Sequence, residues 1–227
     1  MKTSSHDLDD WRKFSAAKTH GTSDEACHAL AWRMAVDEKP LGRVLEFGAG
    51  SGAFARGLHE TKLFESIVCA DILSRPGDLS SEIRWIQADL NYPLSEPDGF
   101  FDTILSIEVI EHLENPRAVF REFHRLLGPG GRLILTTPNQ ESLRSYAGLV
   151  LGGHFAAFLG ASYPAHITAL MRKDLERICA ETGFGKPLFA YSGDGRIPKL
   201  TRWRWQKFLP FLRGRIFSDN FGMVVRK

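Results

Sequence analysis

The sequence predicts an α/β fold in which helices cover both faces of one doubly wound, mostly parallel sheet. Short apolar runs alternate with stretches whose apolar residues recur at helical spacing, a pattern typical of parallel sheets. The first apolar run ends in a glycine-rich turn, which is common between a strand and a helix in such folds. With 227 residues, 43% of them hydrophobic, the chain is long enough for a single domain with a full-sized core.

The predicted elements follow one another in a regular order. Apolar runs predict strands over 43–47, 66–70, 83–88, 101–107 and 132–136. Helical spacing predicts helices over 23–37, 51–62, 116–127 and 168–182. Pro116 suits the first turn of its helix, where a missing N–H costs no hydrogen bond, and Gly183 is placed as the C-cap of the last helix. The glycine-rich run 128–131 should end the third helix, and two further apolar runs, 188–191 and 221–225, complete the sheet.

Three segments depart from this alternation. We expect one domain over 1–227, with an N-terminal helical extension over 1–40, a lid or insertion over 140–166 and a basic aromatic segment over 196–217. The last two segments bear on what the protein binds.

Composition and charge exclude several classes of protein. The formal net charge is +2, so the total charge indicates no particular partner. Three widely spaced cysteines, Cys27, Cys69 and Cys179, favour a reducing compartment over a disulfide framework. The first ten residues lack the apolar core of a signal peptide, and no run approaches the roughly 20 apolar residues of a spanning helix. We therefore expect a soluble protein of the cytoplasm.

The turn after the first predicted strand has the composition of a ligand-binding loop. Gly48, Gly50 and Gly52 permit a tight turn with positive φ and a close approach of a ligand to the backbone. The helix that follows presents free N–H groups to an anion, and ligands of open α/β sheets bind beyond the carboxyl ends of the strands. The stretch GAGSGA at 48–53 also matches the G-x-G-x-x-A pattern of dinucleotide-binding proteins, so the glycines alone do not identify the ligand.

Acidic residues at three successive strand ends help to identify the ligand of this loop. Glu46 precedes the first glycine by two residues, where its charge would repel a pyrophosphate and attract the ammonium group of a methionine moiety. Asp71, at the end of the second strand, can bind vicinal ribose hydroxyls. Asp89 and Leu90, after the third, offer a carboxylate to an adenine amino group and a backbone N–H to a ring nitrogen. Each acid alone could be a helix cap or a loop carboxylate, but together they favour cofactor binding.

These segments together resemble the class I S-adenosylmethionine-dependent methyltransferases over about residues 40–186. The motifs occur in order as VLEFGAGSG at 44–52, AD at 70–71, ADL at 88–90, FD at 101–102 and LLGPGG at 126–131. The resemblance implies a seven-stranded, Rossmann-like sheet whose last strand is antiparallel, and S-adenosylmethionine as the cofactor. It also implies cofactor contacts at Glu46, Gly48, Ala49, Gly50, Gly52, Asp71, Ile72, Asp89, Leu90, Ser106 and Ile107. The last two would lie near the methionine and the transferred methyl group.

A Glu-x-x-Glu-His segment follows the fourth predicted strand. On a helical turn Glu108, Glu111 and His112 would share one face, because positions i, i+3 and i+4 are neighbours there. Two carboxylates and an imidazole suit Mg²⁺ or another divalent metal, and His166 is a candidate fourth ligand. Similar segments occur in the ubiquinone-biosynthesis O-methyltransferases and the small-RNA 3′-terminal 2′-O-methyltransferases, where they hold a divalent metal beside the hydroxyl to be methylated.

The same segment also has interpretations without a metal. The glutamates can cap a helix, and His112 can act as a general base or simply pack. His154 and His166 can be ordinary surface histidines. His112, Glu108 and Glu111 are therefore the candidate catalytic residues, and a metal is one of two ways in which they could act.

The apolar stretch 146–158 within the predicted insertion bears on the acceptor. As a lid it would give the site an apolar wall, which favours an aromatic or lipid-like acceptor, and the ubiquinone-type enzymes are similar here. As an ordinary helix it would pack on the sheet edge.

The basic aromatic segment 196–217 has no acidic residue. Its seven cations are Arg196, Lys199, Arg202, Arg204, Lys207, Arg213 and Arg215. Interleaved tryptophans and phenylalanines suit an anionic membrane surface, and they also suit nucleic acid. Alternatively, the aromatic rings enter the core and the cations stay solvated. The nearly neutral remainder of the chain argues against a dedicated nucleic-acid binder.

The sequence as a whole predicts an S-adenosylmethionine-dependent methyltransferase. We expect O-methylation of a small-molecule or lipid-linked hydroxyl, in a cytoplasmic protein that is peripheral to the inner face of the membrane. One alternative is an NAD-dependent oxidoreductase, on the strength of the G-x-G-x-x-A match. Another is a catalytically silent cofactor-binding protein. The acceptor and the oligomeric state do not follow from the sequence.

Overall fold

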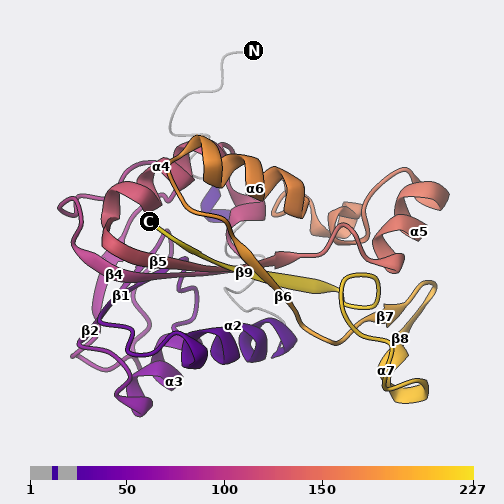
Figure 1. The fold of residues 1–227 in the computed structure, drawn as a ribbon, viewed down its shortest axis with the longest axis horizontal. Coiled ribbons are helices and arrows are strands. Elements are labelled where there is room, and N and C mark those ends of the chain that lie inside the picture. Colours follow the sequence, from indigo (N-terminus) through magenta and orange to yellow (C-terminus); the bar gives the residue numbers. More distant parts are fainter. Residues whose placement is uncertain (1–11, 15–24) are drawn as a thin grey trace.

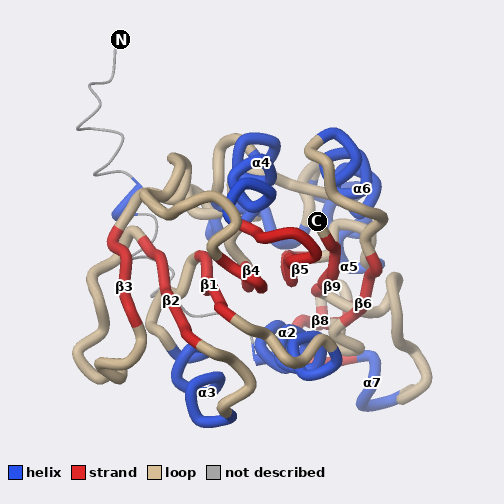
Figure 2. The backbone as a smooth tube through the Cα atoms, turned by 60° about the vertical axis from the view of Figure 1, so that its left-hand side comes forward, coloured by secondary structure: helices blue, strands red, loops and turns tan. Residues whose placement is uncertain are grey.

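Seven strands form one sheet in the order β3-β2-β1-β4-β5-β9-β6, between two layers of helices (Figures 1 and 2). They are β1 (Arg43–Phe47), β2 (Ser66–Asp71), β3 (Arg84–Gln87), β4 (Phe101–Ile107), β5 (Leu127–Pro138), β6 (Leu188–Tyr191) and β9 (Asn220–Arg226). Strands β1 to β5 pair in parallel, and β9 is antiparallel to both of its neighbours. This computed structural model describes residues 12–14 and 25–227. The predicted fold, including the antiparallel strand, is confirmed.

Helices cover both faces of the sheet, as the alternating pattern predicts. Helices α2 (Glu25–Asp37) and α3 (Ala53–Thr61) lie on one face, and α4 (Pro116–Leu126) and α6 (Arg172–Glu181) lie on the other (Figure 1). Helix α4 begins where predicted, because Pro116 occupies its first turn and the Asn115 side chain accepts a hydrogen bond from the N–H of Ala118. Phe120 and Phe123 of this helix are fully buried, and such burial of aromatic rings holds the helix on the sheet.

Six further elements lie at one end of the sheet. They are α5 (Leu143–Gly152), η2 (Ala156–Phe158), η3 (Gly160–Ser162), β7 (Arg196–Ile197), β8 (Leu200–Arg204) and α7 (Trp205–Phe208). Helix α5 and the β7–β8 hairpin extend beyond the sheet at the same end of the molecule (Figure 1). Segment 140–166, predicted to be a lid or insertion, contains a ten-residue helix. Its first turn is capped by the Ser142 side chain, and Gly153 ends it with a φ of +75°.

Two predicted elements have wrong boundaries. The last large helix begins at Arg172 instead of residue 168, because the N–H groups of Ile167 and Thr168 donate to the carbonyl of Glu111 at 3.0 and 2.9 Å. These bonds hold the chain extended beside the segment after β4. Strand β5 is longer than predicted at both ends. The glycine run 128–131 lies within it, at a register shift against β4 between Phe101 and Thr103. Residues 23 and 24 of the first predicted helix lie outside the described residues.

Among the described residues, no helix combines the length and the apolar character needed to cross a membrane.

Candidate functional site

The loop between β1 and α3 has the conformation that its glycines predict. Gly48, Gly50 and Gly52 have φ angles of +86°, +52° and +71°, a region that residues with a side chain rarely adopt. A Cβ atom at Gly48 would also lie 2.3 Å from the side chain of Val109, in the segment that follows β4. The N–H of Gly48 donates to the carbonyl of Ala70 at 2.8 Å, which fixes the loop against the end of β2.

Asp71 is fixed by the backbone at the end of β2. One carboxylate oxygen accepts from the N–H of Gly50 at 2.7 Å, and the other accepts from the N–H of Leu73 at 2.8 Å. Burial raises the pKa of Asp71, and these hydrogen bonds oppose that rise. The carboxylate oxygens have further lone pairs, so the group can also receive ribose hydroxyls. The neighbouring Ile72 is tied to β3, because its carbonyl accepts from the Gln87 side chain at 3.3 Å.

Glu46 lies buried behind the glycine loop. The thiol of Cys69 donates to its carboxylate at 3.7 Å, and burial raises the pKa of Glu46 to about 8. A carboxyl group with this pKa is mostly protonated at neutral pH unless a cation binds next to it. Ala49 of the loop is buried in the core on the α2 and α3 side.

Asp89 follows β3 and already has hydrogen-bond partners in the structure. One of its oxygens accepts from the backbone N–H and from the side-chain amide of Asn91, at 2.9 Å each. The other accepts from the guanidinium of Arg12 at 2.5 Å. Leu90 is buried in the core. Arg12 is a residue that sequence reasoning missed, since an isolated arginine in a polar N-terminal segment carries no distinguishing signal.

The end of β4 does not continue into the predicted helical turn. Ser106 and Ile107 are buried, and the hydroxyl of Ser106 has no hydrogen-bond partner among the described residues. Glu108 then adopts a φ of +55°, which a helix does not contain. The chain forms only the short 3₁₀ turn η1 (Ile110–His112). The expected shared face of Glu108, Glu111 and His112 is therefore wrong, because the backbone turns out of the helical path at Glu108.

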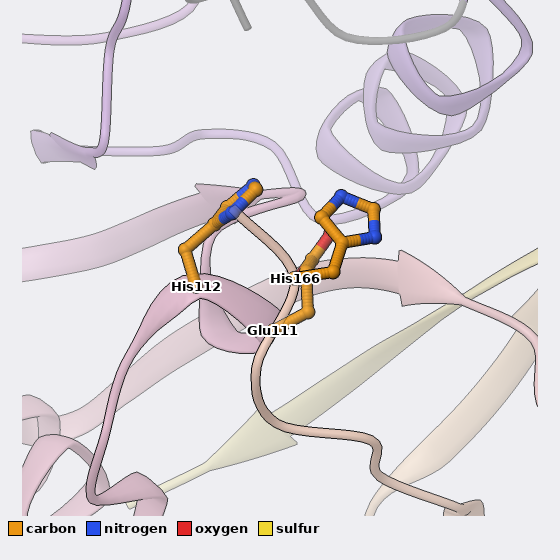
Figure 3. A group of neighbouring side chains, drawn as sticks. All are labelled: Glu111, His112 and His166. Carbon is orange, nitrogen blue, oxygen red and sulfur yellow. The ribbon is translucent and has the colours of Figure 1, made fainter. Parts of the chain in front are cut away.

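Three ligand-type side chains nevertheless converge here. Glu111, His112 and His166 each offer one atom, and these atoms all lie within 4.8 Å of one another (Figure 3). The Nδ1 atoms of His112 and His166 lie 2.7 Å from the carbonyl oxygens of Ala165 and Ala157, respectively. Since a carbonyl only accepts, both rings carry their proton on Nδ1, and both Nε2 atoms keep a lone pair. Histidine ligands of metals are oriented by the same kind of second hydrogen bond.

The electrostatics of this cluster also fit a divalent cation. Glu111 is 1% exposed, and one of its oxygens accepts from the Thr137 hydroxyl at 3.1 Å while the other has no partner among the described residues. Burial raises the pKa of Glu111 to about 8. Burial lowers the pKa of His112, and burial together with the charge of His112 lowers that of His166 to about 4. Neutral imidazoles suit metal binding, whereas the carboxyl group of Glu111 would have to lose its proton to bind a metal. Glu108 lies outside the cluster.

The cluster adjoins the glycine loop. Val109 packs against Gly48, and the charge of Asp71 acts on the pKa of His112. A separate depression, lined by residues such as Lys62 and Pro129, lies at the amino ends of the parallel strands. Ligands of such sheets bind at the carboxyl ends, so we place the functional site at the loop and the cluster.

Comparison with known proteins identifies the family. Residues 19–186 match the model of the family described as Methyltransferase domain. The chain belongs to this family. It is 30% identical over 125 residues to the ubiquinone biosynthesis O-methyltransferase of Xanthomonas euvesicatoria pv. vesicatoria, covering 52% of this chain and 51% of the relative. The protein of the same name from Ruegeria pomeroyi is 32% identical over 127 residues, covering 51% and 49%. The chain thus spans about half the length of these curated relatives.

Solved structures of the same fold match most of this chain. A SAM dependent methyltransferase from Archaeoglobus fulgidus has a TM-score of 0.65 and 18% identity, covering 92% of this chain and 97% of that one. The 1,6-didemethyltoxoflavin-N1-methyltransferase of Burkholderia thailandensis, solved with S-adenosylhomocysteine, has a TM-score of 0.63 and 15% identity, covering 100% and 92%. The [4+2]-cyclase SpnF has a TM-score of 0.59 and 15% identity, covering 88% and 79%. At such identities the likeness shows the fold alone.

Family and fold together confirm the predicted resemblance to the methyltransferases, and they do not favour the NAD-dependent alternative. Since a fold hosts several reactions, the choice of acceptor has to be argued from the site.

Glu46 gives a first prediction about cofactor binding. If the ammonium group of the ligand binds beside it, a carboxyl group with a pKa of about 8 must lose its proton. Affinity for S-adenosylhomocysteine should then rise with pH, by up to about tenfold per unit below pH 8, and level off above. Calorimetry in buffers of different ionisation enthalpy should show proton release. The variant Glu46→Gln should bind without pH dependence, whereas Glu60→Gln, on the exposed side of α3, should behave as the wild type. An unchanged pH profile in Glu46→Gln would contradict the placement.

Proposed function

We propose that the protein transfers the methyl group of S-adenosylmethionine to a hydroxyl of a small or lipid-linked acceptor. The observation that carries this proposal is the cluster of Glu111, His112 and His166 beside the glycine loop. Its two imidazoles, each oriented by a bond from Nδ1 to a backbone carbonyl, suit the removal of a proton from an acceptor hydroxyl. A phenol with a pKa of about 10 is a poor nucleophile at neutral pH until its proton is withdrawn. The names of the curated relatives support an oxygen acceptor.

Each part of the site would have its own role in binding and positioning the reactants. Gly48, Gly50 and Gly52 admit the cofactor to the backbone, Asp71 holds the ribose, and Glu46 neutralises the ammonium group. The buried groups around the end of β4 exclude water from the reacting atoms. The enzyme then contributes mainly position and desolvation to an in-line attack of the acceptor oxygen on the sulfonium methyl group.

His112 could serve in two ways at this point. Its Nε2 lone pair can accept the proton of the acceptor hydroxyl directly. Alternatively, Glu111, His112 and His166 would hold a divalent metal, which would supply a Lewis acid that lowers the pKa of a bound hydroxyl. The orphaned oxygen of Glu111 and the two carbonyl-oriented rings favour the metal.

Methyl transfer from labelled S-adenosylmethionine tests the proposal. The acceptors should be a catechol, the same catechol with a polyprenyl chain, and a matched amine. We expect labelled product from the hydroxylated acceptors, more from the lipid-linked one, and loss of product after chelation. Product from the amine alone would contradict O-methylation, and undiminished activity after chelation would contradict the metal while leaving His112 as the base.

We further propose that the end of the molecule formed by α5 and segment 196–217 contacts an anionic membrane surface. Helix α5 exposes Tyr146, Leu149, Val150 and Leu151, and segment 196–217 exposes Leu200, Trp203, Phe208, Leu209 and Phe211. Large apolar side chains gathered at one end of a molecule mark an interaction surface. A lid over 140–166 placed there would give a lipid-linked acceptor a direct path from the membrane to the site.

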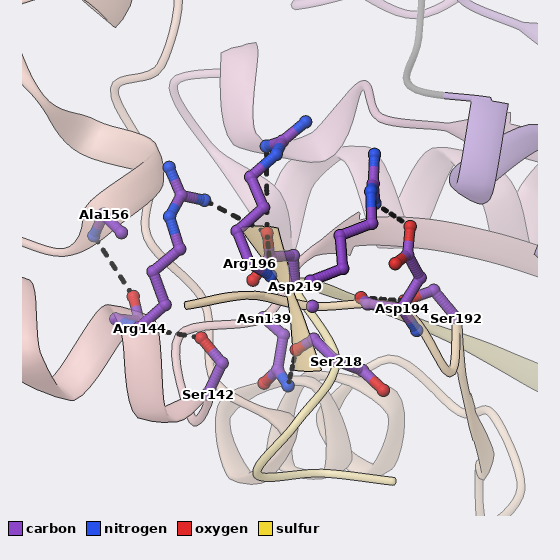
Figure 4. Close-up of polar contacts among 12 residues, drawn as sticks. Asn139, Ser142, Arg144, Ala156, Ser192, Asp194, Arg196, Ser218 and Asp219 are labelled. Carbon is purple, nitrogen blue, oxygen red and sulfur yellow. Dashed lines mark hydrogen bonds and ion pairs between the residues drawn. The ribbon is translucent and has the colours of Figure 1, made fainter. Parts of the chain in front are cut away.

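Polar contacts tie the two parts of this end together. The Asn139 side chain donates to the carbonyls of Arg215 and Ser218 at 2.6 and 2.8 Å, and Asp219 pairs with Arg144 and Arg196 (Figure 4). Several cations of the basic aromatic segment are therefore neutralised by acids from outside it. These internal pairs are Arg196 with Asp219, Arg204 with Asp194 and Arg215 with Glu141. The exposed cations that remain beside the apolar groups are Lys199, Arg202, Lys207 and Arg213.

Vesicle co-sedimentation tests this surface. Each basic residue near an anionic bilayer contributes about 1 kcal/mol, so replacing Arg202, Lys207 and Arg213 with glutamine should weaken binding by about 100-fold at low salt. A matched triple replacement of the exposed Lys62, Lys173 and Arg177 should have little effect. High salt should weaken wild-type binding, because it screens surface charges. Failure of the wild type to sediment with anionic vesicles at low salt would overturn the proposal.

A further inference from the structure

Arg12 lies beside the acid that the sequence assigns to the adenine amino group. We propose that Arg12 is a positioning residue of the cofactor site, which orients Asp89 for the adenine. This inference rests on the proposed function, because it assumes that S-adenosylmethionine binds with its adenine at Asp89.

The guanidinium of Arg12 joins two loops that follow different strands. Its Nη1 lies 2.5 Å from Asp89 Oδ2, after β3, and its Nη2 and Nε lie 2.7 and 3.1 Å from Glu114 Oε1, after η1. The backbone N–H of Glu114 also donates to the side chain of Asn91 at 2.9 Å. The guanidinium carbon lies 5.5 Å from the centre of the Tyr92 ring, within the range of a cation–π contact.

Burial separates this arrangement from an ordinary surface ion pair. The Arg12 and Asp89 side chains are only 15% and 16% exposed, whereas Glu114 is 53% exposed. A single exposed ion pair contributes little to stability. A guanidinium that contacts two acids and an aromatic ring is instead held in one position. Arg12 therefore fixes the carboxylate of Asp89 from the side of the N-terminal segment.

The Asp89 carboxylate has enough acceptor positions to bind Arg12 and an adenine together. Each carboxylate oxygen accepts about two hydrogen bonds. Asp89 Oδ1 already receives two, both from Asn91, while Oδ2 receives that of Arg12. One acceptor position on Oδ2 is left for the adenine amino group. Arg12 is thus expected to strengthen cofactor binding instead of competing with it.

Calorimetry and dissociation kinetics with S-adenosylhomocysteine test this role. Hydrogen bonds to charged groups contribute about 1.5–3 kcal/mol, so Arg12→Gln should raise the dissociation constant by about 10- to 100-fold, mainly through faster dissociation. The same factor should appear with 5′-methylthioadenosine, which lacks the amino acid part. Asp89→Asn should raise the dissociation constant by a similar factor. The double variant should have a dissociation constant no higher than that of the weaker-binding single variant, because the two residues act together.

Two further variants separate positioning from loss of charge or of folding. Glu114→Gln should weaken binding by a smaller factor, because it removes only the second anchor of Arg12. Arg84→Gln removes an equivalent bidentate pair with Glu96 at the other end of β3 and should leave affinity unchanged. Wild-type affinity in Arg12→Gln, tighter binding, or additive effects of Arg12→Gln and Asp89→Asn would overturn the inference. Failure of the wild type to bind S-adenosylhomocysteine would instead overturn the cofactor assignment on which it rests.

Discussion

Substitution of His112 by alanine is expected to slow methyl transfer by about 10²- to 10⁴-fold, the usual contribution of a positioned acid–base group. The reason is that the His112 ring is held beside the glycine loop by a hydrogen bond from Nδ1 to the carbonyl of Ala165, which places the lone pair of the neutral ring on Nε2. Affinity for S-adenosylhomocysteine should stay within about two-fold, because the ring is not part of the adenosine contacts. Single-turnover transfer of a labelled methyl group and calorimetry measure the two quantities separately.

Matched variants distinguish the roles that this histidine could play. His59→Ala, on α3 with its ring paired to Glu82, should have no effect on transfer. If a metal is held, His166→Ala and Glu111→Gln should reduce the rate as strongly as His112→Ala, and added Mg²⁺ should partly restore it. If His112 acts alone, only the replacement of His112 should reduce the rate of methyl transfer strongly. An active His112→Ala enzyme would contradict both versions.

Replacement of Asp71 by alanine should weaken cofactor binding by about 100-fold or more. Asp71 would lose up to two charged hydrogen bonds to the ribose, each of which contributes about 1.5–3 kcal/mol. It also holds the N–H groups of Gly50 and Leu73, so the glycine loop itself should lose its fixed position. Thermal unfolding should show a loss of about 1–3 kcal/mol in the free energy of unfolding, since two backbone donors lose their partner.

The neighbouring surface acid offers a control for Asp71. Asp78 pairs with Arg56 at 3.2 Å and is well exposed, so Asp78→Ala should change neither affinity nor stability appreciably. Equal affinity of Asp71→Ala and the wild type for S-adenosylhomocysteine would show that the ribose binds elsewhere.

The fold and the cofactor loop could be predicted from the sequence because their signals are local. A buried strand, three glycines and a strand-end acid such as Asp71 are read within a few residues of one another. The start of α6 could not be predicted, because the hydrogen bonds of Ile167 and Thr168 to Glu111 span more than fifty residues of sequence. Tertiary contacts of this kind override helical propensity.

The cluster beside the loop could be predicted only in part. The spacing indicates Glu111 and His112, and the position of His166 before the next predicted helix makes it a candidate. The expected helical face fails at Glu108, whose positive φ no pattern indicates. The contact of Arg12 with Asp89 joins residues 77 positions apart, so no local pattern announces it.

We propose above all that the turn from Gly48 to Gly52, together with Glu46 and Asp71, binds S-adenosylmethionine. A calorimetric titration of the wild-type protein with S-adenosylhomocysteine and, separately, with NAD tests it most directly. We predict saturable one-to-one binding of S-adenosylhomocysteine, lost in Asp71→Ala, and no measurable heat with NAD. Binding of NAD in preference to S-adenosylhomocysteine, or binding of S-adenosylhomocysteine that Asp71→Ala leaves unchanged, would contradict the claim.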